Sequence, residues 1–478
     1  MPNFQTLAST PLTPLPTLKL SLAYGIFLLI IAASYFLNPL LPLGLTFILC
    51  LFAFRHLIPF EVLFYIIVVM FLIVSPNVPP HEKHFRSPIL LKSIFLAQDI
   101  ILFSALFLFA VTLLTQKIEF SKTKTFVEKA FLLFTISFIC SLAVGLWQNN
   151  RTEYVWSEVR DFAYLMLFWL ILAYASRFER AYVYFLVFIG CCAVFAIVSI
   201  IDAALRYQFS RYNSGISFLL LPGFFFSLAT LVVQAFRKHK TFLIVLLTVF
   251  LFAILISFTR GLYFGVITGL LAVIVCAGAV QMIRLAVILV AGAGVVATLL
   301  FLFNLTPDFL VDQTVNRGME VAGGIDVSST ERILEAIAVL EAFPKHPVFG
   351  AGIGGTIWVY RFTDFVGKAG MTDWWFIHNN YFQTLHKQGL FGLITLLALW
   401  LGAIWKSYRL YKRVTDLKKK TLLLTTLGTL VGFMAVSMTS AVMTYSNTNF
   451  LNALLFVIVV IIEREQNHRD QSERENER

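Results

Sequence analysis

Long apolar runs alternate with short polar connections along most of the chain. Only helices and closed barrels satisfy their backbone groups inside a bilayer, and a spanning helix needs about 20 apolar residues. The pattern therefore predicts an all-α polytopic integral membrane protein with about 12–14 transmembrane helices. The expected spans are 18–36, 39–54, 57–75, 95–115, 127–148, 160–177, 180–204, 215–236, 241–258, 261–279, 283–304, 388–405, 421–444 and 449–463.

Four regions follow from this pattern. Residues 1–304 hold transmembrane helices 1–11, residues 305–387 form one large extramembrane loop, and residues 388–463 hold the C-terminal transmembrane helices. Residues 464–478 are charged and almost free of apolar side chains, which predicts a disordered tail. The composition agrees with this interpretation, because 59% hydrophobic and 13% charged residues leave too little polar surface for a soluble protein.

Basic residues follow every second apolar run, which sets an expected orientation. The positive-inside rule puts these connections and both termini in the cytoplasm, and the loop 305–387 on the opposite side. We attribute the net charge of +11 to loops at an anionic leaflet rather than to nucleic-acid binding. The basic connections contain Arg55, Lys117, Lys122, Lys124, Arg177, Arg180, Arg237, Lys238, Lys240, Arg284 and the stretch from Lys406 to Lys420.

The large loop contains one clear amphipathic helix. Ser328 and Glu331 have the spacing of a capping box, and Pro344 follows the expected end of the helix. The apolar stripe of this helix consists of Ile333, Leu334, Ile337 and Leu340. The glycine-rich stretch FGAGIGG at 349–355 follows a helix rather than a strand, so it predicts a close backbone approach and not a dinucleotide site.

Several arginines stand where spans meet the expected non-cytoplasmic surface. Arg206 and Arg211 lie in RYQFSRYNSG, and Arg260 lies in SFTRG, in a turn too short to expose it fully. A guanidinium remains charged and offers a planar set of donors that matches phosphate oxygens. The alternative is that these side chains only anchor helix ends at the membrane surface.

One histidine in the large loop is a candidate proton acceptor. His378 lies in WWFIHNNYFQTLHKQG, where an imidazole can take a proton from a sugar hydroxyl near neutral pH. A histidine in an aromatic interfacial belt is the alternative. His386 follows about two helical turns later on nearly the same face. The sequence contains no HExxH, Walker, paired CxxC or GxSxG motif, so we expect no metal or cofactor.

These stretches together resemble the O-antigen ligase / O-antigen polymerase superfamily, most strongly across 206–392. The resemblance rests on RYNSGISFLLLP, SFTRGLYFG, ERILEAIAVLEAFPKHPVFGAGIGG and IHNNYFQTLHKQGLFG, in this order. The chain departs from many relatives in having Phe-Thr before Arg260, and its fourteen expected spans exceed the twelve usual for the ligases.

The resemblance implies a GT-C-like membrane glycosyltransferase of the bacterial inner membrane, with its active site on the periplasmic side. Such an enzyme transfers a glycan from undecaprenyl pyrophosphate to a hydroxyl acceptor, without metal or nucleotide. Carried over by position, Arg211 and Arg260 hold the pyrophosphate and His378 acts on the acceptor hydroxyl. Arg332 is a further candidate for a phosphate or acceptor contact.

The leading hypothesis is a ligase that attaches a glycan to lipid A–core in lipopolysaccharide biosynthesis, by an inverting mechanism. The first alternative is a polymerase that joins repeat units on the same carrier, and transfer to a protein hydroxyl is another. A lipid-linked sugar transporter is an alternative of a different class. Transporters tend to show internal repeats and polar residues at mid-membrane, whereas the ionisable residues here stand at span ends.

Overall fold

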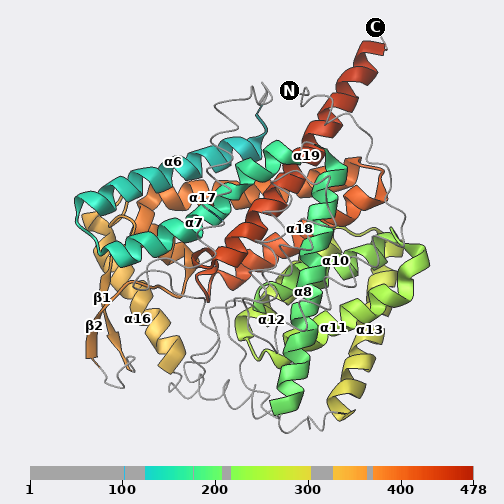
Figure 1. The fold of residues 1–478 in the computed structure, drawn as a ribbon, viewed down its shortest axis with the longest axis horizontal. Helices are drawn as coiled ribbons and strands as arrows, with labels where there is room; N and C mark the ends of the chain where they lie inside the picture. The colour runs from blue at the N-terminus through green and yellow to red at the C-terminus, as the bar shows by residue number, and fades with distance from the viewer. Residues whose placement is uncertain are drawn as a thin grey trace, which may run out of the picture.

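The computed structural model describes residues 102, 124–175, 177–206, 217–302, 327–362 and 370–476. Apart from Leu102, the four expected spans between 18 and 115 lie outside these residues, as does Arg211. The described chain is helical except for one hairpin and the connecting turns (Figure 1). The helices are α6 (Phe126–Trp147), α7 (Thr152–Tyr174), α8 (Phe178–Arg206), α10 (Leu220–Val233), α11 (Lys240–Ile256), α12 (Arg260–Cys276), α13 (Ala279–Leu302), α16 (Val327–Ala342), α17 (Asn380–Arg413), α18 (Leu417–Val436) and α19 (Ser446–Asn476).

Among the described residues, 5 helices are long and apolar enough to cross a membrane. They are α6, the Phe178–Ile201 part of α8, α17, α18 and α19, and α10 to α13 supply shorter apolar segments. Apart from α16, which belongs to the large loop, each described helix overlaps one expected span, and α17 and α19 extend well beyond theirs. The protein is therefore an all-α polytopic membrane protein, as the apolar pattern predicted.

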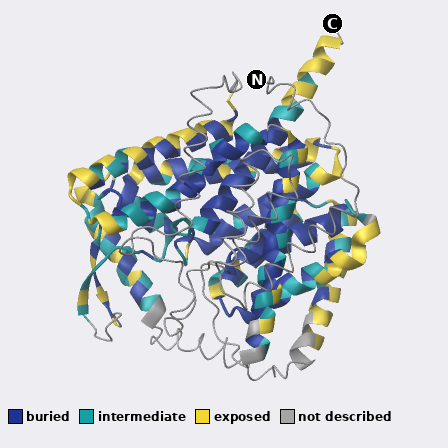
Figure 2. Cartoon of the chain, viewed as in Figure 1, coloured by how far each residue is buried: buried dark blue, intermediate teal, exposed yellow. Residues whose placement is uncertain are grey.

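Helices α18 and α19 form the centre of the bundle (Figure 2). A stripe of glycines lets α12 pack closely against α18. Gly261, Gly265 and Gly269 recur every four residues on α12, and a Cβ built on Gly269 would lie 2.4 Å from the backbone oxygen of Gly428 on α18. Small residues at this spacing let transmembrane helices bring their backbones together. This packing fixes the start of α12, where Arg260 stands.

The two ends of the bundle carry different side chains. One end, the basic end, joins α17 to α18 and continues into the last turns of α19. There Lys406 contacts Glu463, and Arg464 contacts Glu128 at 2.7 Å. The opposite end is the site end, and it holds the starts of α12, α17 and α19 together with α16 and the hairpin.

The C-terminal segment corrects one expectation. Residues 464–476 continue α19 as a helix, although their composition predicted disorder. The ion pairs of α19 at the basic end hold its backbone where the charged segment begins, and Gln466 donates to Asp470 one turn further on at 2.9 Å. A helix already nucleated by packing extends into polar sequence at little further cost.

A two-stranded antiparallel hairpin was not expected from the sequence. Strand β1 (Ile357–Arg361) pairs with β2 (Gly370–Trp374), with Ile357 opposite Trp374. Residues Ile357, Val359 and Arg361 point inward, whereas Trp358 and Tyr360 are exposed. The apolar residues on both faces hid the alternation that usually indicates a strand. The hairpin packs against α16 at the site end (Figure 1).

Candidate functional site

His378 lies immediately before α17 and is held by a buried carboxylate. Its Nδ1 is 2.9 Å from Oε1 of Glu335, and its backbone N–H donates to Oε2 of the same residue at 2.8 Å. Glu335 is 1% exposed, whereas the His378 side chain is 30% exposed. With Glu335 ionised, Nδ1–H donates to the carboxylate and Nε2 of the neutral ring can accept a proton.

Arg361 on β1 completes this cluster. Its Nη1 contacts Oε1 of Glu335 at 2.5 Å and its Nη2 contacts Oε2 of Glu331 at 3.2 Å, so one guanidinium joins two successive turns of α16. The guanidinium also stacks 4.3 Å from the centre of the Trp374 ring. A buried carboxylate needs such a partner to stay ionised away from water. Arg361 therefore gives Glu335 a cationic partner and holds its carboxylate in place for His378.

Helix α16 faces the opposite way from its sequence pattern. Ile333, Ile337 and Leu340 are exposed, and the buried face carries Glu331 and Glu335. The carboxylate of Glu331 accepts from the backbone N–H of Phe362, and the side chain of Ser328, its expected capping partner, lies outside the described residues. The side of α16 that carries the two carboxylates therefore packs on the hairpin, where Arg361 pairs with both.

Arg260 and His378 approach the same turn at the end of α18. A Cβ on Gly261 would lie 2.5 Å from Oγ1 of Thr439, so the start of α12 packs on residues 437–440. From the other side, Asn379 donates through Nδ2 to the carbonyl of Met438 at 2.9 Å. Asn379 also caps α17 by accepting from Tyr381. Arg260 is exposed as the first residue of α12, although the tight turn had predicted partial burial.

The other expected site residues are distributed differently. Arg206 is the last residue of α8, where only its backbone is described, and Arg211 lies outside the described residues. Arg332 is half-buried on α16, next to Glu331. His386 is 6% exposed within α17 and lines a second cavity, so it does not share the exposed position of His378.

The glycine-rich turn has the role expected of it. Gly350, Gly352 and Gly354 all have positive φ values, which favour glycine. A Cβ on Gly352 would lie 2.3 Å from the backbone nitrogen of Gly145 on α6. The turn thus docks backbone to backbone against the end of α6, as a close-approach element and not a phosphate cradle.

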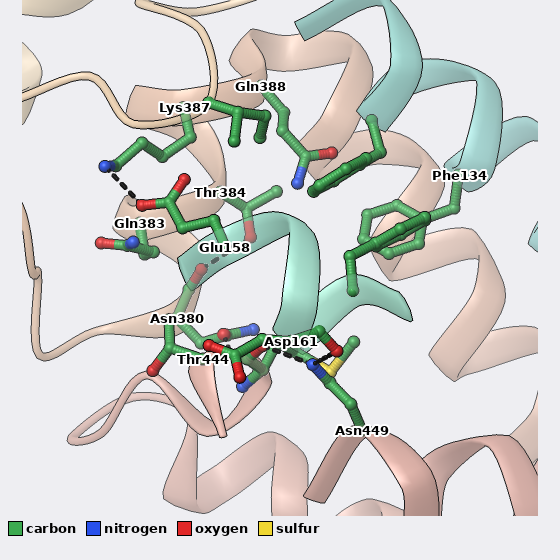
Figure 3. A pocket seen from close by; sticks show the side chains of 14 residues that line it. Phe134, Glu158, Asp161, Asn380, Gln383, Thr384, Lys387, Gln388, Thr444 and Asn449 are labelled. Carbon is green, nitrogen blue, oxygen red and sulfur yellow. Dashed lines mark hydrogen bonds and ion pairs between the residues drawn. The ribbon is translucent and has the colours of Figure 1, made fainter. Parts of the chain in front are cut away.

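A buried polar cavity of about 60 Å³ lies beside the start of α17 (Figure 3). Lys387 donates to Glu158 of α7 at 2.7 Å, and both side chains are buried. The polar residues of α17 recur at helical spacing, so one buried face of this helix is polar. That face consists of Asn380, Gln383, Thr384, Lys387 and Gln388. Gln383 in turn accepts from the backbone of Ile377, next to His378.

Glu335 and Arg361 are the residues that sequence reasoning missed. Glu335 stands four residues after Glu331, a spacing that puts both carboxylates on one helix face, and this was the available signal. No sequence signal pointed to Arg361, because its two partners lie 26 and 30 residues away along the chain. Within the described ranges, no three His, Cys, Asp or Glu side chains group as metal ligands would.

Comparison with known proteins gives a family match that includes residues of the site end. Residues 242–397 match the model of a family described as O-antigen ligase. The matched segment includes Arg260, Glu335, Arg361 and His378. No individual curated protein matches the chain. This match supports the resemblance to the O-antigen ligase superfamily, because three of the four sequence stretches that carry the resemblance lie within it, and the similarity implies a glycosyltransferase-type enzyme.

Proposed function

We propose that the protein transfers a glycan from undecaprenyl pyrophosphate to a hydroxyl of lipid A–core, with His378 as the general base. The observation that carries this proposal is the hydrogen bond between His378 Nδ1 and the buried carboxylate of Glu335. The family match supports O-antigen ligase or polymerase activity in general, and the finer assignment rests on the site.

In the proposed reaction, the acceptor oxygen attacks the anomeric carbon while its proton passes to Nε2 of His378. The bond between that carbon and the pyrophosphate oxygen breaks, and its electron pair leaves with undecaprenyl pyrophosphate. Fixed cations stabilise the charge on this leaving group, and we assign that role to Arg260 and Arg211. Attack from the face opposite the leaving group inverts the configuration at the anomeric carbon.

The electrostatics of the bundle support an orientation with the site end in the periplasm. The basic end carries the connections around Arg177, Arg237 and Lys412, and cytoplasmic loops of membrane proteins are rich in such residues. His378 and Arg260 belong to the other end. A donor anchored by its polyprenyl chain then presents its pyrophosphate at the membrane surface, where α12 begins.

The test is complementation of a deletion strain with the wild type, His378→Ala, or His468→Ala as a control. His468 lies exposed on the last turns of α19, at the basic end. Envelope polysaccharide is separated on a gel, and lipid-linked glycan is extracted in parallel. We expect His378→Ala to leave polymer on the carrier together with bare lipid A–core, and His468→Ala to behave as wild type.

Other results of this complementation test distinguish the alternative functions. Core that carries a single repeat unit in the His378→Ala strain identifies a polymerase instead of a ligase. A wild-type profile with both His378→Ala and Arg260→Ala would remove the catalytic assignment. Accumulation of the lipid-linked glycan on the cytoplasmic face would identify a transporter.

A further inference from the structure

A second cavity, of about 410 Å³, opens at the site end beside the C-terminal half of α16. Its walls come from the end of α6, from α16, from the glycine-rich turn, from β1 and from α17. We name it the α16 cavity, and its volume lies within the range of small-ligand sites, about 300–1,000 Å³. Its polar and aromatic lining residues include Gln148, Glu341, His346, Thr356, Trp358 and His386.

The α16 cavity lies along the same helix as the His378 site. Ala338 and Glu341 line it, three and six residues beyond Glu335. At 1.5 Å per residue they stand about 5 and 9 Å further along the helix axis. A small apolar cluster of Val339, Ile357 and Ile377 adjoins both places, because Ile357 lines the cavity and Ile377 directly precedes His378. The cavity is therefore separate from the proton-transfer site but within reach of a short saccharide that extends from it.

The lining has the chemistry of a carbohydrate site. Trp358 is 66% exposed on β1, and an exposed indole offers an electron-rich face to the C–H bonds of a sugar ring. Glu341, Lys345 and His346 supply both acceptors and donors for hydroxyl groups at the rim. These charges balance one another, which favours a neutral polyhydroxylated ligand over an anion.

One polar atom in the wall still lacks a partner. Nε2 of His386 has no hydrogen-bond partner among the described residues, although the side chain is 6% exposed. Buried polar groups are nearly always paired, so this nitrogen is a candidate to hydrogen-bond a hydroxyl group in the cavity. The backbone N–H of Ala351 donates to the His386 carbonyl at 2.7 Å, which ties the glycine-rich turn to α17 at this wall.

We propose that the α16 cavity is a saccharide subsite, which holds a sugar of the glycan next to the one that reacts at His378. The sugar belongs either to the donor glycan or to the core acceptor, which share this chemistry. The proposal rests on the proposed function, because it takes the ligand class from the transfer reaction. It assigns Trp358 to ring stacking, and Glu341 and His386 to hydroxyl contacts.

The first test measures binding without catalysis. The purified full-length protein is titrated with oligosaccharide released by mild acid from the host's lipid-linked glycan, and separately with deacylated core oligosaccharide. We expect Trp358→Ala to weaken binding of one of them about five- to tenfold. The matched control is Tyr360→Ala, because Tyr360 lies on the same exposed face of β1 but outside the cavity. Which oligosaccharide responds identifies the source of the sugar.

A second variant and a transfer assay complete the design. Ala342→Phe should fill the cavity and abolish binding, and a melting curve for each variant confirms folding. In the transfer assay, Trp358→Ala should raise KM with little change in kcat, whereas His378→Ala should lower kcat and still bind oligosaccharide. Equal binding by wild type, Trp358→Ala and Ala342→Phe would overturn the subsite. Full activity of His378→Ala would overturn the proposed function, whatever the binding result.

Discussion

His378 and Glu335, which stand 43 residues apart in the chain, meet through two hydrogen bonds, one from the ring and one from the backbone. The backbone bond fixes where the residue lies, and the ring bond fixes how the imidazole is turned. A histidine in an aromatic surface belt would need neither bond. The pair is thus the strongest structural reason to regard His378 as a chemical residue.

Replacement of Glu335 by Gln should lower kcat for glycan transfer by about 10- to 100-fold, with KM little changed. The amide cannot hold the imidazolium that forms when His378 takes a proton. Transfer assays in membrane vesicles measure this effect, and Glu153→Gln on the exposed start of α7 is the control. The double variant with His378→Ala should be no worse than His378→Ala alone, because the two residues act as one unit. Additive losses would refute this coupling.

Replacement of Arg260 by Lys should reduce kcat/KM by about tenfold or more, although the charge is retained. A lysine ammonium cannot make the two parallel hydrogen bonds that a guanidinium makes to phosphate oxygens. The readout is a donor titration in the same vesicles. Arg469→Lys, on the exposed part of α19, should be silent. Equal activity of the wild type and Arg260→Lys would indicate that Arg260 only anchors the end of its helix.

The buried pair of Lys387 and Glu158 should behave as a coupled unit in stability measurements. Lys387→Met leaves a buried carboxylate without its cation, which costs about 3–5 kcal/mol. The double variant Lys387→Met with Glu158→Gln removes both charges and should recover much of that loss. Thermal unfolding of the wild type, both single variants and the double variant in detergent completes this double-mutant cycle. A double variant as unstable as the sum of the single variants would show that the two side chains do not interact.

The glycine stripe of α12 predicts a sensitive position. Gly269→Ala puts a methyl group against the backbone oxygen of Gly428, so α12 and α18 must separate at a cost of about 1–3 kcal/mol. Because α12 carries Arg260, transfer activity should fall as well. Gly278→Ala is the matched control, since a Cβ there meets nothing within 4 Å. The melting temperature and the transfer rate should both be lower for Gly269→Ala alone.

The predictions made from the sequence were most accurate for features that depend on the local pattern of residues. Runs of apolar residues predicted each described helix of the bundle, because a bilayer accepts only such segments as helices. The spacing of glycines in 349–355 likewise predicted a close backbone approach, which Gly352 makes with Gly145. Family resemblance drew attention to Arg260 and His378, and the described structure brings the starts of α12 and α17 to one turn.

The predictions made from the sequence failed for side chains whose interaction partners are distant along the chain. The apolar stripe that makes α16 amphipathic contains Ile333, Ile337 and Leu340, and these three residues are exposed. Nothing local to α16 reveals that Arg361, on a strand that had not been expected, will attract Glu331 and Glu335. Similarly, nothing local to α17 shows that its polar face is buried, because Lys387 pairs with Glu158 of α7 beside a cavity.

The amino-acid sequence by itself determined that this chain is a helical membrane protein, because long apolar segments partition into the bilayer and a helix satisfies their backbone hydrogen bonds within the segment. It also determined which side chains were available for phosphate and proton chemistry. Only the tertiary structure decided that His378 is paired with Glu335, and that Arg361 holds this carboxylate. Ion pairs between buried groups depend on distance in space and on exclusion of water, and neither quantity is encoded at any single position of the chain.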